Sequence, residues 1–183
     1  MAEIMHKLPS SKTVLEPDYT SVFKKTDETN AVLVVDGKKF HVNKAVLSYY
    51  SDYFKTLFES EFKEKSMKMI EIKDVKLEDF ATLLSLVLKD PIMPTVNNAE
   101  KLLELADRFL LPAAKHHVEY VLLESSVHCL DKIRIAEKFQ LEDLFERGLS
   151  KCKETLAKQN ILRNPIYQQF SMETKAKVFY RCI

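Results

Sequence analysis

Glycine is nearly absent from this sequence, which contains two glycines and no tryptophan among its 183 residues. A loop that cradles a phosphate needs several glycines, because only glycine lets the backbone N–H groups approach so closely. The sequence therefore offers no nucleotide-binding loop of that kind. The same scarcity favours a helix-rich fold with few left-handed turns.

An excess of either charge is also missing, since 28 basic and 27 acidic residues leave a net charge of +1. This balance gives no electrostatic reason for binding to nucleic acid or to an anionic membrane. No apolar run approaches the length of a membrane span, and the N-terminus has no apolar signal core. We expect no nucleic-acid partner, no membrane partner, and a location in the cytoplasm, the nucleus or both.

Cysteine is scarce and odd in number, with Cys129, Cys152 and Cys182 in positions that lack metal-site spacing. Without a secretory signal core, we expect reduced thiols in an intracellular compartment. Cys129 and Cys152 also fall near apolar helical stripes, where cysteine behaves as a small hydrophobic residue.

Catalytic and metal-binding constellations are not found. His116 and His117 are adjacent, so their side chains diverge on a helix and cannot chelate together. His41 and His128 have no evident partner, and Cys129 beside His128 is no nucleophile without a third orienting group. We expect no enzyme activity, no catalytic residues, no metal and no cofactor. A thiol or metal hydrolase would be reconsidered only if alkylating the cysteines abolished function.

What the sequence does contain is a strand, turn, strand and helix pattern over residues 31–58. Ala31 to Val35 is a continuous β-branched run, and Asp36-Gly37 suits the positive φ angles of a two-residue hairpin. Asn43 is a suitable helix cap, and apolar residues then recur at helical spacing. These residues are Val46, Tyr50, Phe54, Leu57 and Phe58. Phe40 and Phe54 should be buried.

This segment resembles the BTB/POZ family, closest in style to adaptors of the MATH-BTB type. The matching residues, at the family's spacing, are Val35, Gly37, Phe40, Lys44, Val46, Leu47, Ser51, Tyr53, Phe54, Leu57 and Phe58. Asn43 replaces the usual His, and Asn30 an acid, but both can still form local hydrogen bonds. The resemblance implies an α+β BTB/POZ fold, with a small mixed sheet flanked by helical hairpins.

The pattern continues with a strand over 67–72, a helix from Leu77 to Leu88, and an Asn97-Glu100 capping box opening the next helix. Pro112 starts a further helix. Apolar stripes then indicate a helical pair, formed by Leu130, Ile133, Ala136 and Phe139, and by Phe145, Leu149, Cys152 and Leu156. A last helix is expected over 172–180 with Ser171 as its cap.

The expected organisation is a lead over 1–14, a BTB/POZ domain over 15–123 and a C-terminal helical extension over 124–183. In BTB adaptors a helical pair in this position, the 3-box or start of a BACK region, extends the cullin-binding surface. Adaptors of this type usually recruit their substrate through a separate MATH, kelch or zinc-finger domain, which would be too large for either end. We therefore expect either a fragment of a longer chain, or a short member that recruits through a bound partner or dimerises with a fuller relative. The sequence does not identify the substrate.

A short amphipathic helix is indicated by Leu15, Tyr19, Val22 and Phe23. In many family members such a helix packs across a two-fold dimer interface. The resemblance thus implies a homodimer, or pairing with another BTB protein. The alternative is a helix folded onto its own core.

The main candidate contact is Phe62-Lys63-Glu64, which resembles the hydrophobic-x-Glu motif that holds a cullin in BTB adaptors. An exposed Phe can enter an apolar pocket of the partner, and Glu64 can supply an orienting hydrogen bond or ion pair. Phe109 is a second candidate by family position, where the family usually has Tyr. Phe62 could instead fold onto the core, and Phe109 could be one more core residue.

The leading hypothesis is therefore a non-enzymatic substrate adaptor of a type-three cullin-RING ubiquitin ligase. The second is a homotypic BTB assembly module in a transcriptional or cytoskeletal scaffold, without a cullin partner.

Overall fold

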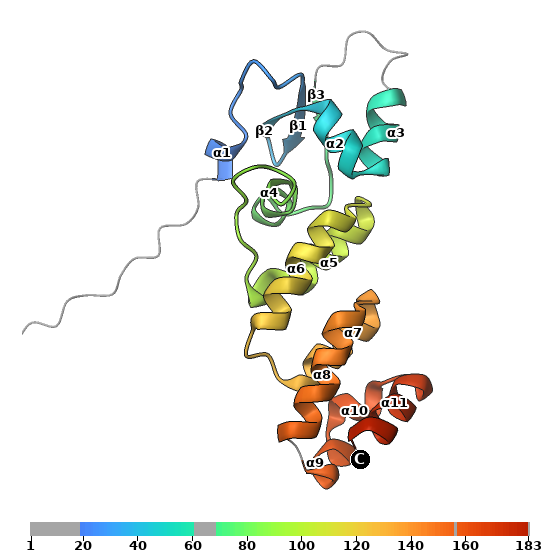
Figure 1. The fold of residues 1–183 in the computed structure, drawn as a ribbon. Coiled ribbons are helices and arrows are strands. Elements are labelled where there is room, and N and C mark those ends of the chain that lie inside the picture. Colours follow the sequence, from blue (N-terminus) through green and yellow to red (C-terminus); the bar gives the residue numbers. More distant parts are fainter. Residues whose placement is uncertain (1–18, 61–68, 156, 183) are drawn as a thin grey trace, which may run out of the picture.

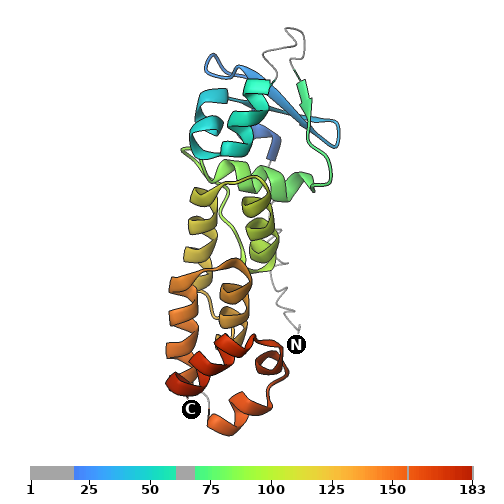
Figure 2. The same cartoon turned by 90° about the vertical axis from the view of Figure 1, so that its right-hand side faces the viewer.

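The protein is described from a computed structural model, in which residues 19–60, 69–155 and 157–182 are placed. Figures 1 and 2 show an elongated molecule in which the sheet lies at one end and successive helices extend away from it. The last helices, α9 to α11, lie at the far end from the sheet.

The sheet is small and mixed, as expected. Strand β1 (Ala31–Val35) pairs antiparallel with β2 (Lys38–Val42) and parallel with β3 (Met69–Glu71), in the order β2-β1-β3. Asp36 and Gly37 form the hairpin turn with φ angles of 47° and 74°. This left-handed backbone is the one that a tight two-residue hairpin requires.

Two helices follow the hairpin where the apolar spacing indicated one continuous stripe. Asn43 caps α2 (Lys44–Tyr50) by accepting from the backbone N–H of Ala45 and Val46, and Asn30 Oδ1 accepts from Lys44 N. The chain is extended at Ser51 before α3 (Asp52–Ser60) begins. The Ser51 hydroxyl accepts from Phe54 N and donates to the Phe109 carbonyl.

This break changes the stripe that the spacing predicted. Phe54 and Phe58 are buried, whereas Tyr50, at the end of α2, is 38% exposed. The hydroxyl of Ser51 provides the helix-breaking bonds, because a buried serine readily competes with the helical backbone.

An aromatic cluster joins the sheet to the helices next to it. Helix α1 (Tyr19–Val22) packs on β2 and on α4 (Leu77–Ser85), α5 (Val96–Arg108) packs on α4, and α6 (Pro112–Glu124) packs on α5. Phe40 contacts Phe23 and Phe80, and Phe80 contacts Phe109 in turn. Phe40 is 1% and Phe54 0% exposed, which confirms that both are buried.

The start of α5 differs from the expected capping box. Thr95 precedes the helix, and its backbone N–H donates to Asn98 Oδ1 at 2.8 Å. The cap is therefore Thr95, two residues before the predicted Asn97, and the predicted Asn97-Glu100 pair is wrong. Pro112 occupies the first turn of α6, as predicted.

The C-terminal part is helical. It consists of α7 (Cys129–Phe139), α8 (Glu142–Thr155), α9 (Lys158–Arg163), α10 (Pro165–Gln169) and α11 (Met172–Cys182). The predicted α7 stripe is buried, and Ser171 Oγ accepts from Thr174 N at the start of α11. Both predictions are confirmed.

Cys129 and Cys152 form a disulfide between α7 and α8, so the expectation of reduced thiols is wrong for this pair. The two helices pack closely: a Cβ added at Gly148 would lie 2.7 Å from Ile133 Cγ1. This approach leaves 5.4 Å between the Cα atoms of the two cysteines. Cys182 is a free thiol and donates to the Leu149 carbonyl at 3.3 Å.

Within the placed ranges, no helix is both long and apolar enough to cross a membrane. The same residues contain no group of three or more His, Cys, Asp or Glu side chains arranged to hold a metal ion.

Candidate protein-interaction surfaces

The predicted cullin contacts Phe62 and Glu64 lie outside the described residues. They belong to the segment that connects the end of α3 with β3. For this prediction the structure describes the two flanking elements, α3 and β3, and the residues around them.

Phe109, the other predicted cullin contact, is fully buried. Its ring stacks on Phe54 and contacts Tyr53 and Phe80 edge-on, with centroid separations of 5.0 to 5.7 Å. Its carbonyl accepts from Ser51 at 2.7 Å. The ring points into the core because it closes the buried stripe of α5, so this side chain is not available for a surface contact.

Leu110, one residue later, is the exposed hydrophobic side chain at this place. It is 52% exposed and has a φ of 48°, a left-handed conformation that turns the chain between α5 and α6. It lines a surface hollow together with Asp52, Ala106, Asp107, Leu111, Pro112 and Lys115. Lys115 Nζ bonds Asp107 Oδ1 at 2.8 Å on its rim. The sequence signal for this turn was Pro112, which marks a helix start and so a break before it.

An exposed stripe on α3 connects this hollow with the segment that contains Phe62. Asp52, Lys55, Thr56 and Glu59 recur every three to four residues and are exposed, whereas Phe54 and Phe58 face the core. We call this stripe together with Leu110 the α3 face. Its first residue lines the hollow, and its last lies just before residues 61–68.

Of the four predicted dimer residues, the structure describes three, and these differ in how far they are buried. Leu15 lies outside the described residues. Tyr19 and Val22 are half-buried on α1 and pack against the core, and Phe23 is 2% exposed with its ring 4.8 Å from that of Phe40. Phe23 is therefore a core anchor for α1, and its ring offers little surface to a second chain.

Two exposed tyrosines on α2 were missed by the sequence analysis. Tyr49 is 82% exposed, and its ring meets that of Tyr50 edge-on at 5.0 Å. The apolar spacing places Tyr50 on a buried stripe, because the spacing gives no sign that the helix ends at Ser51. Exposed aromatic side chains of this kind are enriched among the residues that dominate interfaces.

Buried polar side chains tie the C-terminal helices to α6. Glu119 is 8% exposed and accepts from Leu144 N in the first turn of α8. Lys132, 3% exposed on α7, donates to the carbonyls of Leu123 and Ser125 at the end of α6. Burial lowers the pKa of Lys132, and the nearby Arg147 adds to this effect. These bonds satisfy helix-end groups that would otherwise be unpaired.

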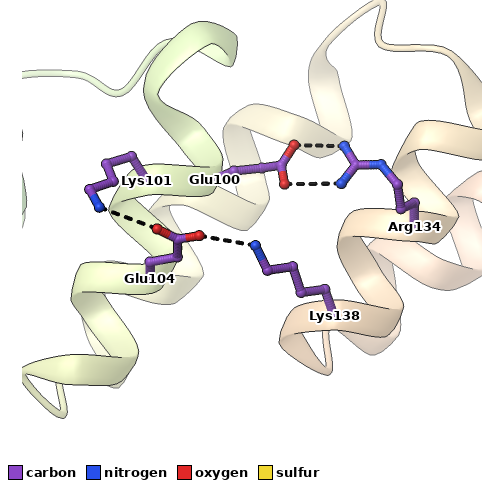
Figure 3. A network of polar contacts seen from close by, with 5 residues as sticks. All are labelled: Glu100, Lys101, Glu104, Arg134 and Lys138. Carbon is purple, nitrogen blue, oxygen red and sulfur yellow. Dashed lines mark hydrogen bonds and ion pairs between the residues drawn. The ribbon is translucent and has the colours of Figure 1, made fainter.

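An ion-pair network also joins α5 to α7 (Figure 3). Arg134 holds Glu100 through two bonds of 2.6 and 3.0 Å, and Lys138 holds Glu104 at 3.0 Å. Lys101 bonds the other Glu104 oxygen at 3.3 Å. Hydrogen bonds from these cations lower the pKa of both carboxyl groups. The network thereby links α7 to α5.

This network predicts an acid-sensitive contribution to stability. The folded pKa of Glu100 lies below its ordinary value near 4.5, so the stabilisation is complete above that value and is lost as the pH falls through the folded pKa. Because Glu100 and Arg134 are 38% and 31% exposed, water screens the pair, and we expect roughly 1 kcal/mol. Urea unfolding of Glu100→Gln at pH 7 and pH 3 should show this loss at pH 7 and a smaller one at pH 3.

The matched control is Glu154→Gln, which removes an ion pair with Lys151 inside α8. We expect it to cost less than Glu100→Gln at pH 7, because no tertiary contact is lost. Equal losses at both pH values for Glu100→Gln would contradict the role of the charged carboxylate.

Comparison with protein-family models and with known proteins finds matches over more than half of this chain. The family model described as "BTB/POZ domain" matches residues 19–126. BTB and MATH domain-containing protein 36 of Caenorhabditis elegans is 36% identical over 68% of this chain and 39% of its own length. BTB/POZ domain-containing protein Y57A10B.3 of the same organism is 30% identical over 96% of this chain and 56% of its own. The chain thus spans between about two fifths and just over half of the length of these relatives.

Among solved structures, the BTB domain of human Gigaxonin aligns with a TM-score of 0.43 at 21% identity, over 61% of this chain and 97% of that one.

Proposed function

Because this chain belongs to the BTB/POZ family, we propose that its module for protein interaction joins a cullin scaffold to a substrate in a type-three cullin-RING ubiquitin ligase. The observation that carries this proposal is the position of Phe62-x-Glu64. The motif directly follows α3, where the exposed α3 stripe ends. A hydrophobic-x-Glu motif at this place in the BTB frame is the one with which adaptors of the family hold a cullin.

The α3 face supports a contact of adequate size. Helix α3 has nine residues, so it is about 13 Å long. A partner that accepts Phe62, two residues beyond the end of α3 in the sequence, and also covers the Leu110 hollow beside Asp52 would need a standard interface of about 800 Å² per partner. Leu110 replaces Phe109 in this proposal, because Leu110 is the exposed residue of the two.

The helical pair α7–α8 supports the proposal in a second way. In this proposal the pair serves as the 3-box or the start of a BACK region, and the Glu100–Arg134 and Lys132 contacts hold it against α5 and α6. A fixed pair can extend a binding surface without a large ordering cost on association.

In this role the protein contributes proximity and no chemistry of its own. Holding a substrate near a ubiquitin-charged enzyme converts an encounter between separate molecules into a reaction within one complex. The working compartment would be the cytoplasm, the nucleus or both. The substrate is a further protein that the sequence does not identify.

Titration calorimetry of the wild-type chain against the N-terminal fragment of a type-three cullin tests the proposal. We expect saturable binding with one cullin fragment for each chain. If the wild-type protein binds no cullin but still associates with itself, the alternative of a homotypic BTB scaffold is the better interpretation.

We also propose that the chain forms a two-fold dimer, or pairs with another BTB protein, through the α1 region and the preceding Leu15. The half-buried Tyr19 and Val22 would face the partner, while Phe23 anchors α1 to its own core. Replacing Tyr19 and Val22 together by Glu should give a folded monomer, because an isologous contact places each charge twice in the interface.

Sedimentation velocity at micromolar concentration measures this result, and circular dichroism checks the folding. Met172→Glu is the control, since Met172 is 81% exposed on α11 and its charge should leave the dimer intact. A wild-type protein that sediments as a monomer would overturn the dimer proposal.

A further inference from the structure

The disulfide between Cys129 and Cys152 links the two helices of the C-terminal pair. Cys129 is the first residue of α7, and Cys152 lies in the last turn of α8. The two side chains are 5% and 0% exposed, and both belong to a second hydrophobic cluster with Leu130, Ile133, Leu149 and Ile161. The bond therefore crosses the interior of the extension, away from the aromatic core of the sheet end.

If the protein is an intracellular adaptor, as proposed above, its disulfide lies in a reducing compartment. Glutathione and thioredoxin keep thiols reduced in the cytoplasm and nucleus, where disulfides are usually transient. The 5.4 Å Cα separation lies within the range that allows a disulfide without backbone movement. The folded chain thus holds the two cysteines at a separation at which the bond can form.

We propose that Cys129 and Cys152 form a reversible redox site, which peroxide oxidises to the disulfide and glutathione reduces, and which locks α7 to α8 when oxidised.

Of the two paired cysteines, Cys129 is the more accessible, at 5% exposed against 0% for Cys152. It lines a surface cavity of about 400 Å³, together with Lys132, Arg147 and Lys151. Lys132 lies three residues after Cys129, so the two share one face of α7. A position at a helix N-terminus and nearby cations both favour the thiolate, which is the nucleophilic form.

The charges of this cavity are only partly neutralised. Arg147 lies 3.8 Å from Glu124, and Lys151 bonds Glu154 at 2.9 Å, while Lys132 is held by two backbone carbonyls. Of the cavity residues, Glu124 is the one carboxylate among three basic side chains. Cys152 does not line the cavity and is fully buried, which fits the second, resolving cysteine.

Hydrogen peroxide can supply the two-electron oxidation that joins the two thiols in a disulfide. The Cys129 thiolate attacks one peroxide oxygen, the O–O bond breaks, and Cys129 becomes a sulfenic acid while hydroxide leaves and takes up the thiol proton as water. Cys152 sulfur then attacks the Cys129 sulfur, the S–S bond forms as the S–O bond breaks, and the leaving hydroxide takes up the Cys152 thiol proton as a second water. Two thiols and one peroxide thus give one disulfide and two waters. Two molecules of glutathione reverse the reaction and leave as oxidised glutathione.

Cys182 provides an internal comparison. It is half-buried at the end of α11, and it has no partner for an internal disulfide, since the other two of the chain's three cysteines pair with each other. We expect Cys182 to remain a thiol under conditions that oxidise the pair.

The test uses the full chain, reduced and then treated with a stoichiometric amount of hydrogen peroxide. Differential alkylation and mass spectrometry of the peptides should show a Cys129–Cys152 link and an alkylated Cys182. Excess reduced glutathione should remove the link. The oxidised protein should melt about 5 to 10 °C above the reduced one, because a cross-link restricts the unfolded chain.

Variants identify the source of that rise. Cys129→Ser and Cys152→Ser should each abolish it, and Cys182→Ser should retain it. A protein that forms no Cys129–Cys152 link with peroxide, a link that glutathione leaves intact, or a rise that persists in Cys129→Ser would each overturn the proposal. The wild-type peptide analysis does not depend on whether a variant folds. None of these measurements involves a cullin, so failure of the adaptor proposal is recognised separately by calorimetry.

Discussion

Replacing Phe109 by alanine is expected to cost about 3 to 5 kcal/mol of folding stability. The ring is fully buried and contacts three other aromatic side chains, Tyr53, Phe54 and Phe80. Its removal leaves a cavity at the junction of α3, α4 and α5, since none of these rings can move without losing its other contacts. Such a loss is a large part of the 5 to 15 kcal/mol that stabilises an ordinary domain.

Urea unfolding followed by circular dichroism measures the Phe109→Ala effect. Leu110→Ala is the matched control: it truncates the neighbouring side chain, which is half-exposed, and should cost less than about 1 kcal/mol. In cullin binding the order should reverse, with Leu110→Ala weakening the affinity of a folded protein. A Phe109→Ala variant of wild-type stability with selectively lost cullin binding would restore the surface role that family position suggested.

The second large effect is expected from Phe62→Ala combined with Glu64→Ala, which should abolish cullin binding and leave folding and dimerisation unchanged. If Phe62 is an anchor, its truncation alone should cost about 2 kcal/mol or more, roughly thirtyfold in affinity. Loss of Glu64 removes the orienting carboxylate as well, so the double variant should bind the cullin more weakly still.

Calorimetric titration against the N-terminal cullin fragment measures this loss, and thermal unfolding separates it from a core role. Lys63→Ala is the matched control within the same motif and should change the affinity by less than about 1 kcal/mol. A lower melting temperature of the double variant would indicate that Phe62 packs into the core. Unchanged affinity would remove the motif from the proposed interface.

The local elements followed from the sequence because short-range physics specifies them. Asp36-Gly37 set the hairpin, Asn43 and Ser171 cap their helices, and Pro112 begins α6. Each of these depends on the conformational preference or hydrogen-bonding group of one or two residues. The periodic apolar residues likewise identified the buried face of α7.

The sequence also indicated the family, since the matching positions in residues 31–58 have fixed spacing. It proposed Phe62 and Glu64 by the same frame, and these remain predictions because they lie outside the described residues. The sequence could not show which of the two side chains, Phe109 or Leu110, is exposed on the surface. Their exposure depends on a left-handed turn at residue 110, which a leucine adopts only because the surrounding packing requires it.

Other features were decided by tertiary contacts alone. The break between α2 and α3 depends on a bond from Ser51 to the carbonyl of Phe109, 58 residues away. The pairing of Cys129 with Cys152 depends on the close approach of α7 and α8 at Gly148. The bidentate contact of Glu100 with Arg134 spans 34 residues. Periodicity and capping rules read only neighbouring residues, so they predicted which residues are buried, whereas the partner of each buried or charged group was set by the packing of distant helices.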